Sequence, residues 1–262
     1  MVALLTLRLM TRRRFYAPIE AFSRDARSAT LNADETRHLR EVLRLKVGDE
    51  VYVFDGRGHE FRGQVQAIEK NSTLLTSVTA AEPASPESPL NLTLAVALLK
   101  GEKFDLVVQK ATELGVASVV PVISTRADIR IRNDEEAEHK TIRWRRIALE
   151  ATKQCGRARL MKMEAPITFA ELMNHQQGSN EIHLMFAERD GTSFATAMDG
   201  VEQRSDTMIA LVGSEGGWSD EEIIQARESG WKIVTLGGRT LRAETAAIIT
   251  AALLQLRFGD LS

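Results

Sequence analysis

The stretch LTLAVALLKGEKFDLVVQKATELG, residues 92–115, decides the fold class. Its first eight residues form a continuous apolar run, which is typical of a strand buried on both faces of a parallel sheet. The part that follows has apolar residues at helical spacing, namely Phe104, Val107, Val108, Ala111 and Leu114. Gly115 then supplies a residue suited to end a helix. The stretch therefore predicts one strand–helix unit of an α/β domain.

The same alternation continues toward the C-terminus. Further apolar runs predict strands at SVVPVIS (118–124), EIHLMFAE (181–188), TMIALVG (207–213) and KIVTLG (232–237). A long charged helix is predicted from Asp134 to Cys155, with one apolar face made of Trp144, Ile147, Ala148 and Ala151. Strands separated by helices in this way indicate a mostly parallel sheet.

The N-terminal part has a different pattern. Residues 34–45 have the spacing of a helix, residues 51–65 alternate apolar and polar side chains around a DGRG turn, and TLLTSVTA (73–80) reads as another strand. A proline-rich stretch follows and predicts a stiff linker. We therefore expect a small β-barrel with one helix over residues 1–80, a linker over 81–90 and an α/β domain over 91–262. The first ten residues are expected to be an extension or a first strand.

The composition limits the function classes. Of the 262 residues, 44% are hydrophobic, so a packed core is expected, and the net charge of −2 rules out an overall polycation. Residues 1–80 contain 13 basic against 10 acidic side chains, a mild excess that either suits a polyanion or is random scatter.

Cysteine and histidine usage adds two expectations. Cys155 is the only cysteine, so no internal disulfide can form, which fits a reducing, cytoplasmic compartment. The histidines are dispersed without metal-ligand spacing, so no metal is expected; they are His38, His59, His139, His175 and His183.

Three predicted strand ends stand out, because ligands of such sheets bind where strands end. They are ALLKGEK (97–103), LVGSEGGWSDEEI (211–223) and TLGGRTLRAETA (235–246). In the second, glycines at 213, 216 and 217 let the backbone approach a ligand, and Ser219 with Glu222 forms a capping box. The loop is neither GxGxxG nor a P-loop, and Glu215 would repel phosphate, so it suits a neutral or cationic ligand. An ordinary glycine-rich turn is an equally good interpretation.

The third strand end carries charge beside an apolar helix. Arg239 and Arg242 lie three residues apart, and Glu244 stands where a carboxylate suits the helix dipole. The arginines are either ligand contacts or structural groups that bond backbone carbonyls. The helix from Ala246 to Leu256 is apolar on almost every side, so it must be buried, by the sheet and a second subunit or in a monomer core.

The pair LVGSEGGWSDEE and LGGRTLRAETAA resembles the signature motifs of the RsmE-type ribosomal RNA methyltransferases of the SPOUT class. RRFYAP, HLREVLRLKVGDEVYVFDG, LLKGEKFDLVVQKATELGV and RWRRIALEATKQCGR extend the resemblance from Arg13 to Leu256. The chain departs from the family at Ser214, where proline is usual, and at Thr240, where isoleucine is usual. The second departure lies in the loop of residues 236–241, so the detailed shape of that loop stays open.

The resemblance implies an N-terminal PUA-like barrel that binds RNA and a C-terminal trefoil-knotted domain that binds S-adenosylmethionine. It also implies a homodimer that forms 3-methyluridine in 16S ribosomal RNA, free or in the small subunit. The cofactor residues it implies are Leu98, Leu211, Val212, Gly213, Glu215, Gly216, Gly217, Leu236, Gly237, Leu241, Arg242, Thr245 and Ala246.

We expect a fixed arginine, Arg242 or Arg239, to stabilise charge on the uracil oxygens as the imide loses its proton. Glu244 and Glu215 are candidates for the proton acceptor, without a ranking. The expected phosphate contacts of the first domain are Arg12, Arg13, Arg14, Arg37, Arg40 and Arg44. Arg157 resembles a family position near the active site, so we expect it to contact an RNA phosphate or the opposite subunit.

Two rival functions remain. A non-catalytic RNA-binding dimer would keep the fold, but the intact GSEGG and LRAET motifs argue against it. A nucleotide-dependent oxidoreductase is disfavoured because GxGxxG and an acidic residue at the end of a second strand are both lacking.

Overall fold

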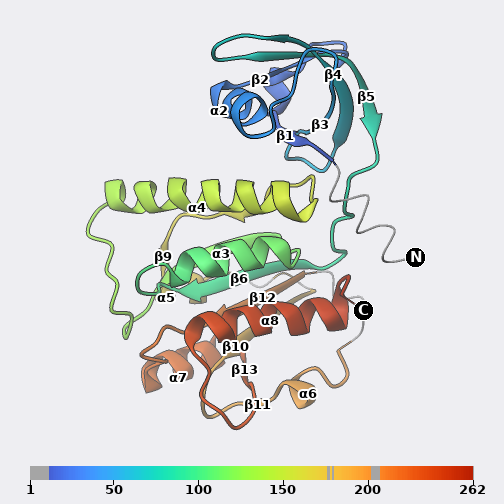
Figure 1. Cartoon of the computed structure of the whole chain (residues 1–262). Coiled ribbons are helices and arrows are strands. Elements are labelled where there is room, and N and C mark those ends of the chain that lie inside the picture. The colour runs from blue at the N-terminus through green and yellow to red at the C-terminus, as the bar shows by residue number, and fades with distance from the viewer. Residues whose placement is uncertain (1–11, 176–177, 179, 202–206, 262) are drawn as a thin grey trace. The chain divides into compact units, whose positions relative to one another are not determined.

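The computed structural model describes residues 12–175, 178, 180–201 and 207–261. The chain divides into two compact units (Figure 1). The first contains the residues up to Glu87 together with Thr152–Leu160, and the second contains Ser88–Ala151 and the residues from Met161 on. The extension or strand expected at residues 1–10 lies outside the described residues.

The first unit is built on a five-stranded sheet. Its strands lie in the order β1 (Arg14–Tyr16), β3 (Glu50–Phe54), β4 (Glu60–Ile68), β5 (Thr73–Ala81) and β2 (Ala29–Leu31). All neighbours are antiparallel except β1 and β3. The short helices are η1 (Ile19–Ala21), α2 (Ala33–Arg37) and its π-helical continuation η2 (His38–Val42). The predicted barrel is thus a PUA-like half-barrel, filled by residues such as Phe15, Leu39 and Val53.

Nine residues from the middle of the chain complete this unit. The guanidinium of Arg14 donates to the carbonyl oxygens of Thr152, Lys153 and Arg157 at 3.2, 3.0 and 2.8 Å. The Lys153 ammonium lies 2.9 Å from the carboxylate of Glu35. The predicted boundaries include this segment in the 91–262 domain, because a long helix leads into it and its partners lie far away along the chain. The limits 1–80 and 91–262 otherwise stay proposals.

The second unit is built on a parallel sheet. Its order is β11 (Thr192–Ser193), β13 (Lys232–Thr235), β10 (Glu181–Phe186), β12 (Thr207–Val212), β6 (Asn91–Ala97), β7 (Ser118–Ile123) and β8 (Lys162–Met163), with β9 (Ile167–Thr168) also paired to β7. Every pairing within it is parallel, as the apolar runs predicted.

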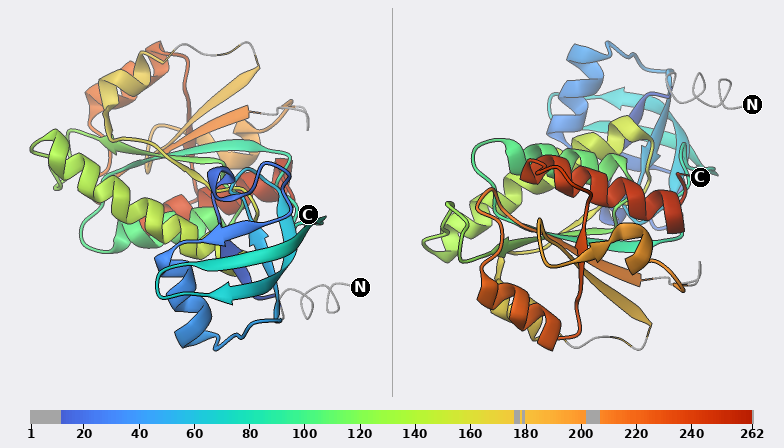
Figure 2. Two further views of the ribbon diagram at one scale, coloured as in Figure 1. Left: turned by 90° about the horizontal axis from the view of Figure 1, so that it is seen from above. Right: turned by 90° about the horizontal axis from the view of Figure 1, so that it is seen from below.

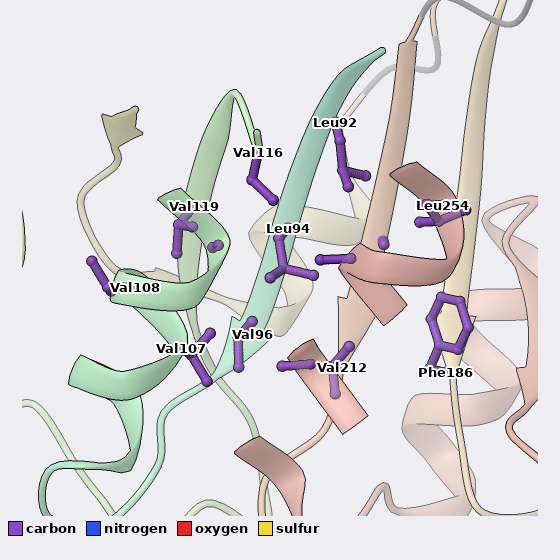
Figure 3. Close-up of a cluster of buried hydrophobic side chains, with 14 of the residues drawn as sticks. Leu92, Leu94, Val96, Val107, Val108, Val116, Val119, Phe186, Val212 and Leu254 are labelled. Atoms are coloured by element: carbon purple, nitrogen blue, oxygen red, sulfur yellow. The ribbon is translucent and has the colours of Figure 1, made fainter. Parts of the chain in front are cut away.

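Helices cover both faces of this sheet (Figures 1 and 2). They are α3 (Lys103–Glu113), α4 (Asp134–Cys155), α5 (Phe169–Met173), α6 (Phe194–Ala197), α7 (Asp220–Glu228) and α8 (Ala243–Phe258). On one face, α3 and α8 pack on β6 and β12 through Leu94, Val107 and Leu254 (Figure 3). On the other face, α5 and α7 enclose a second core around Trp218. Burying two faces is what the uniformly apolar strands require.

The predicted architecture, a parallel α/β domain with a small β-sheet unit before it, is confirmed. Helix α4 has the predicted bounds, and its predicted apolar face is confirmed: Trp144, Ala148 and Ala151 are buried. Helix α8 begins three residues earlier than predicted, at Ala243. The trefoil knot stays a prediction. None of the helices in the described part of the chain combines the length and the hydrophobicity that a membrane span requires.

Candidate functional site

A cavity of about 570 Å³ lies in the second unit where β10, β12 and β13 end. It is lined by residues 186–188, 212–218 and 236–243, together with Lys103 and Ala246. Each of the three segments begins at the last residue of a strand or directly after it. Because the three strands are neighbours in a parallel sheet, the segments meet at one edge. This is the edge at which ligands of parallel α/β sheets bind.

The glycines of the loop after β12 are fixed by close neighbours. A Cβ on Gly216 would lie 2.6 Å from the carbonyl oxygen of Arg126, and one on Gly217 would lie 2.7 Å from a carboxylate oxygen of Glu188. Gly217 also has φ of +64°, which disfavours other residues. The loop is therefore a specific, tightly packed conformation rather than an ordinary turn.

Trp218 anchors the end of this loop. Its side chain is fully buried, and its Nε1 donates to the carbonyl oxygen of Phe186 at 2.9 Å, which ties the loop to the end of β10. Ser219 and Glu222 form the predicted capping box at the start of α7. The cavity wall is thus held by the core on one side and by a capped helix on the other.

Glu215 forms an ion pair across the cavity rim. Its Oε1 accepts hydrogen bonds from Lys103 Nζ at 2.8 Å and from the Lys100 backbone N–H at 3.4 Å. Partial burial raises the pKa of Glu215, but the hydrogen bonds from Lys103 and from backbone N–H groups outweigh it, so this pKa lies below the ordinary value. The rim therefore carries an ionised carboxylate next to an ammonium group.

The loop after β13 presents two exposed arginines. Arg239 and Arg242 both line the cavity, and within the described part of the chain neither forms an ion pair. Arg242 is the N-cap residue of α8, and its carbonyl oxygen accepts from Ala246 N at 2.8 Å. The backbone of Arg242 is thus fixed while its guanidinium stays available for a ligand.

Most of the predicted cofactor residues meet at this cavity. Those that line it are Val212, Gly213, Glu215, Gly216, Gly217, Leu236, Gly237, Leu241, Arg242 and Ala246. Three do not line it: Leu98 and Leu211 are buried in the core, and Thr245 lies in α8 outside the lining. Glu244 is also absent from the lining, and one of its carboxylate oxygens is buried without a partner among the described residues.

Sequence reasoning missed several lining residues. They are Lys103, Phe186, Ala187, Glu188, Trp218 and Ala243. Glu188 could have been predicted from the rule that ligands bind where strands end, because Glu188 directly follows the apolar run of β10. Lys103 ends the quoted stretch ALLKGEK, but only the fold shows that it reaches Glu215.

The arginines proposed for RNA divide into two groups. Arg13, Arg37, Arg40 and Arg44 are exposed, as a phosphate contact requires. Arg12 is mostly covered, because it lies over the Tyr52 ring at 4.5 Å and donates to the Glu82 carbonyl oxygen at 2.8 Å.

Arg14 and Arg157 differ from the prediction, because both are buried. Arg14 forms a bidentate pair with Glu60 at 3.1 and 3.2 Å, and Arg157 pairs with Glu87 at 2.8 Å. The guanidinium of Arg14 donates to both carboxylate oxygens of Glu60 and to three backbone carbonyl oxygens, and the buried guanidinium of Arg157 donates to Glu87, so neither group is exposed to an RNA phosphate. We therefore withdraw these two residues from the proposed phosphate contacts.

Comparisons with known proteins agree with this geometry. Residues 86–255 match the family model described as an RNA methyltransferase domain, and residues 31–76 match an RNA methyltransferase PUA domain. Ribosomal RNA small subunit methyltransferase E of a Synechocystis strain is 32% identical over 86% of this chain and 72% of its own length. The protein of that name from Bacillus subtilis is 25% identical over 86% and 88%.

Two solved structures are similar over nearly the whole chain. A putative methyltransferase from Legionella pneumophila, in complex with S-adenosylmethionine, superposes with a TM-score of 0.85 at 30% identity, over 95% of this chain and 99% of that one. Ribosomal RNA small subunit methyltransferase E from Neisseria gonorrhoeae, bound to S-adenosylmethionine, gives 0.83 at 30% identity, over 96% and 100%.

Proposed function

Since this chain belongs to the RNA methyltransferase family that contains ribosomal RNA small subunit methyltransferase E, we propose that it methylates N3 of a uridine in 16S ribosomal RNA with S-adenosylmethionine. The observation that carries the proposal is the cavity at the sheet edge, formed by the two glycine-containing loops that the sequence singled out. We also propose that the protein acts in the cytoplasm, with 16S ribosomal RNA or the small ribosomal subunit as its partner.

The residues of the cavity fit S-adenosylmethionine. This cofactor supplies a methyl group on a sulfonium and carries no phosphate, and the cavity has carboxylates at Glu188 and Glu215 instead of a phosphate loop. Leu236, Leu241 and Ala246 offer apolar surface for an adenine ring. A wall of this kind supports the neutral or cationic ligand expected from the sequence.

Arg242 is our candidate for the group that stabilises charge on the uracil oxygens. Its backbone is held at the start of α8, and its side chain lines the cavity without a competing carboxylate among the described residues. A fixed donor of this type contributes about 10²–10³-fold in rate. Arg239 is the second candidate. Of the two proposed proton acceptors, only Glu215 lines the cavity, so we favour it over Glu244.

The test separates binding from chemistry. Single-turnover methylation and S-adenosylmethionine affinity are measured for Arg242→Ala and, in parallel, for Arg239→Ala. We expect Arg242→Ala to lower the single-turnover rate by about 10²-fold or more while the protein remains folded. If both cofactor affinity and turnover survive in Arg242→Ala, the assignment to Arg242 is wrong.

We also propose that the protein is a homodimer. Helix α8 buries one face on the sheet, but its opposite face remains partly uncovered, with Ile249 and Leu253 half-buried and Leu256 53% exposed. A helix without a polar face is stable in water only when both sides are covered. A second subunit would supply the missing cover.

A further inference from the structure

The loop between β7 and α4, residues 124–133, carries three arginines in an ordered arrangement. We call it the arginine segment. Ile129 and Ile131 pack against the larger core of the second unit, whereas Arg130 and Arg132 are exposed. This alternation directs the apolar side chains inward and the guanidinium groups outward, so the segment is anchored along its length.

The segment lies directly against the cavity loop. The carbonyl oxygen and Cβ of Arg126 lie 2.6 and 3.0 Å from the position that a Cβ on Gly216 would take. The backbone N–H of Thr125 donates to the Glu222 carboxylate at 2.9 Å, at the first turn of α7. Arg126 is exposed, so its side chain leaves the protein beside the glycine loop.

Two arginines of the segment, Arg126 and Arg130, form no close ion pair in the described part of the chain, although Arg126 attracts the Glu221 carboxylate on α7 from beyond ion-pair distance. The one acidic residue of the segment, Asp128, is already paired with Lys100, at 2.6 Å. Within the described residues, no carboxylate lies at ion-pair distance from the guanidinium of Arg126 or Arg130. Arg239 and Arg242, on the loop after β13, likewise have no carboxylate at ion-pair distance within the described residues. Arg126 therefore stands beside the glycine loop that lines the cavity, while Arg239 and Arg242 line the cavity itself.

We propose that Arg126 and Arg130 bind phosphates of the RNA strand that flanks the target base. The inference rests on the proposed function and extends it, because it gives the methyltransferase domain its own RNA contact, independent of the PUA-like unit. An enzyme that modifies a base takes that base out of the stack, and this bends the RNA backbone where the base enters the active site. Guanidinium groups bind the exposed phosphates in bidentate fashion and fix the strand over the cavity.

The test compares the full-length wild type with Arg126→Ala/Arg130→Ala. The probe is a single-stranded RNA oligonucleotide with the sequence of a uridine-containing 16S segment, titrated at several salt concentrations. Removing two phosphate contacts lowers the slope of log K against log salt by about 1.4 and weakens binding by roughly tenfold near physiological salt. Affinity for S-adenosylmethionine and the unfolding midpoint stay at the wild-type values.

Two further variants make the outcome specific. Lys162→Ala/Lys232→Ala removes two exposed charges at the amino ends of β8 and β13, the edge opposite the cavity, and keeps the wild-type slope. Arg126→Lys/Arg130→Lys keeps the charge and restores the slope. An unchanged slope in the alanine variant, an equal loss in the control, or no recovery in the lysine variant each overturns the inference.

The proposed function is judged separately. Methylation of small subunits by the wild type tests it, and the salt slopes test the arginine segment. In steady state, the alanine variant raises KM for RNA about tenfold and leaves kcat within twofold. A fall in kcat alone, with KM unchanged, contradicts a role in RNA binding even if the wild type is an active methyltransferase.

Discussion

Gly216→Ala tests whether the packing of the glycine loop shapes the cavity. The added Cβ would stand 2.6 Å from the Arg126 carbonyl oxygen, closer than real Cβ atoms come to any neighbour. The obstacle is backbone, so the loop itself has to move. Overpacking of this kind costs about 1–3 kcal/mol, while alanine recovers about 0.4–1 kcal/mol by restricting the unfolded chain. A net loss of about 1–2 kcal/mol is expected.

Displacement of the loop is also expected to weaken the binding of S-adenosylmethionine. A shift that costs about 1.4 kcal/mol in binding raises the dissociation constant of S-adenosylmethionine tenfold, which isothermal titration calorimetry resolves. The control is Gly178→Ala, where the nearest atom to an added Cβ is a side-chain carbon of Glu181 at 3.7 Å, an ordinary contact. Urea unfolding is measured for both variants. Our account of the loop is refuted if Gly216→Ala matches Gly178→Ala in both stability and cofactor affinity.

Three further predictions concern a rim contact, a buried ion pair and the subunit interface. Because the pKa of Glu215 lies below its ordinary value of 4.5, its pair with Lys103 stabilises the fold above that value and is lost as the pH falls through the lowered pKa. Lys103→Met should therefore cost about 0.5 kcal/mol at pH 7, after solvent screening, and nothing at pH 2; thermal melts at both pH values check this. Arg14→Ala should destabilise by about 3 kcal/mol in urea unfolding, since the buried Glu60 keeps only Arg12, at 3.4 Å, as a charged partner among the described residues, without changing the salt slope of RNA binding. Leu256→Asp should convert the dimer to a monomer in light scattering, and a wild type that is itself monomeric would contradict the proposed interface.

The elements that were predicted well are those whose signals are local. The apolar run at residues 92–99 and the helical spacing after it correspond to β6 and α3. Ser219 and Glu222 lie three residues apart, so their capping box was visible in the sequence. Patterns of this kind depend only on neighbouring residues and on the geometry of one helix or strand.

The predictions that failed depended on distant partners. Arg14 was expected to contact phosphate because it stands in a run of three arginines, but its partner Glu60 is 46 positions away. Arg157 is satisfied by Glu87, 70 positions away. A basic side chain looks the same in the sequence whether it faces solvent or a buried carboxylate, so only the fold separates these two cases.

The cavity combines features that were predicted from local sequence with features that depend on distant partners. Its glycine loops were recognised from their composition and resemblance, whereas the pairing of Lys103 with Glu215 joins residues 112 positions apart. Glu188 was within reach of the same strand-end reasoning that found Glu215, and it was missed because the apolar run before it was read only as a strand. Charged residues that directly follow buried strands therefore merit inclusion among site candidates.

The return of Thr152–Leu160 to the first unit has a consequence for synthesis. A ribosome makes the residues up to Glu87 first, yet the carbonyl acceptors of Arg14 are not made until the chain has passed Arg157. At about 5–20 residues per second, the nascent N-terminal sheet waits roughly 4–15 s with a guanidinium and carboxylates whose final partners do not yet exist. Most of the methyltransferase strands are still unmade at that moment. The order of translation thus commits this protein to finishing its first unit late, and no single cut in the chain yields that unit whole.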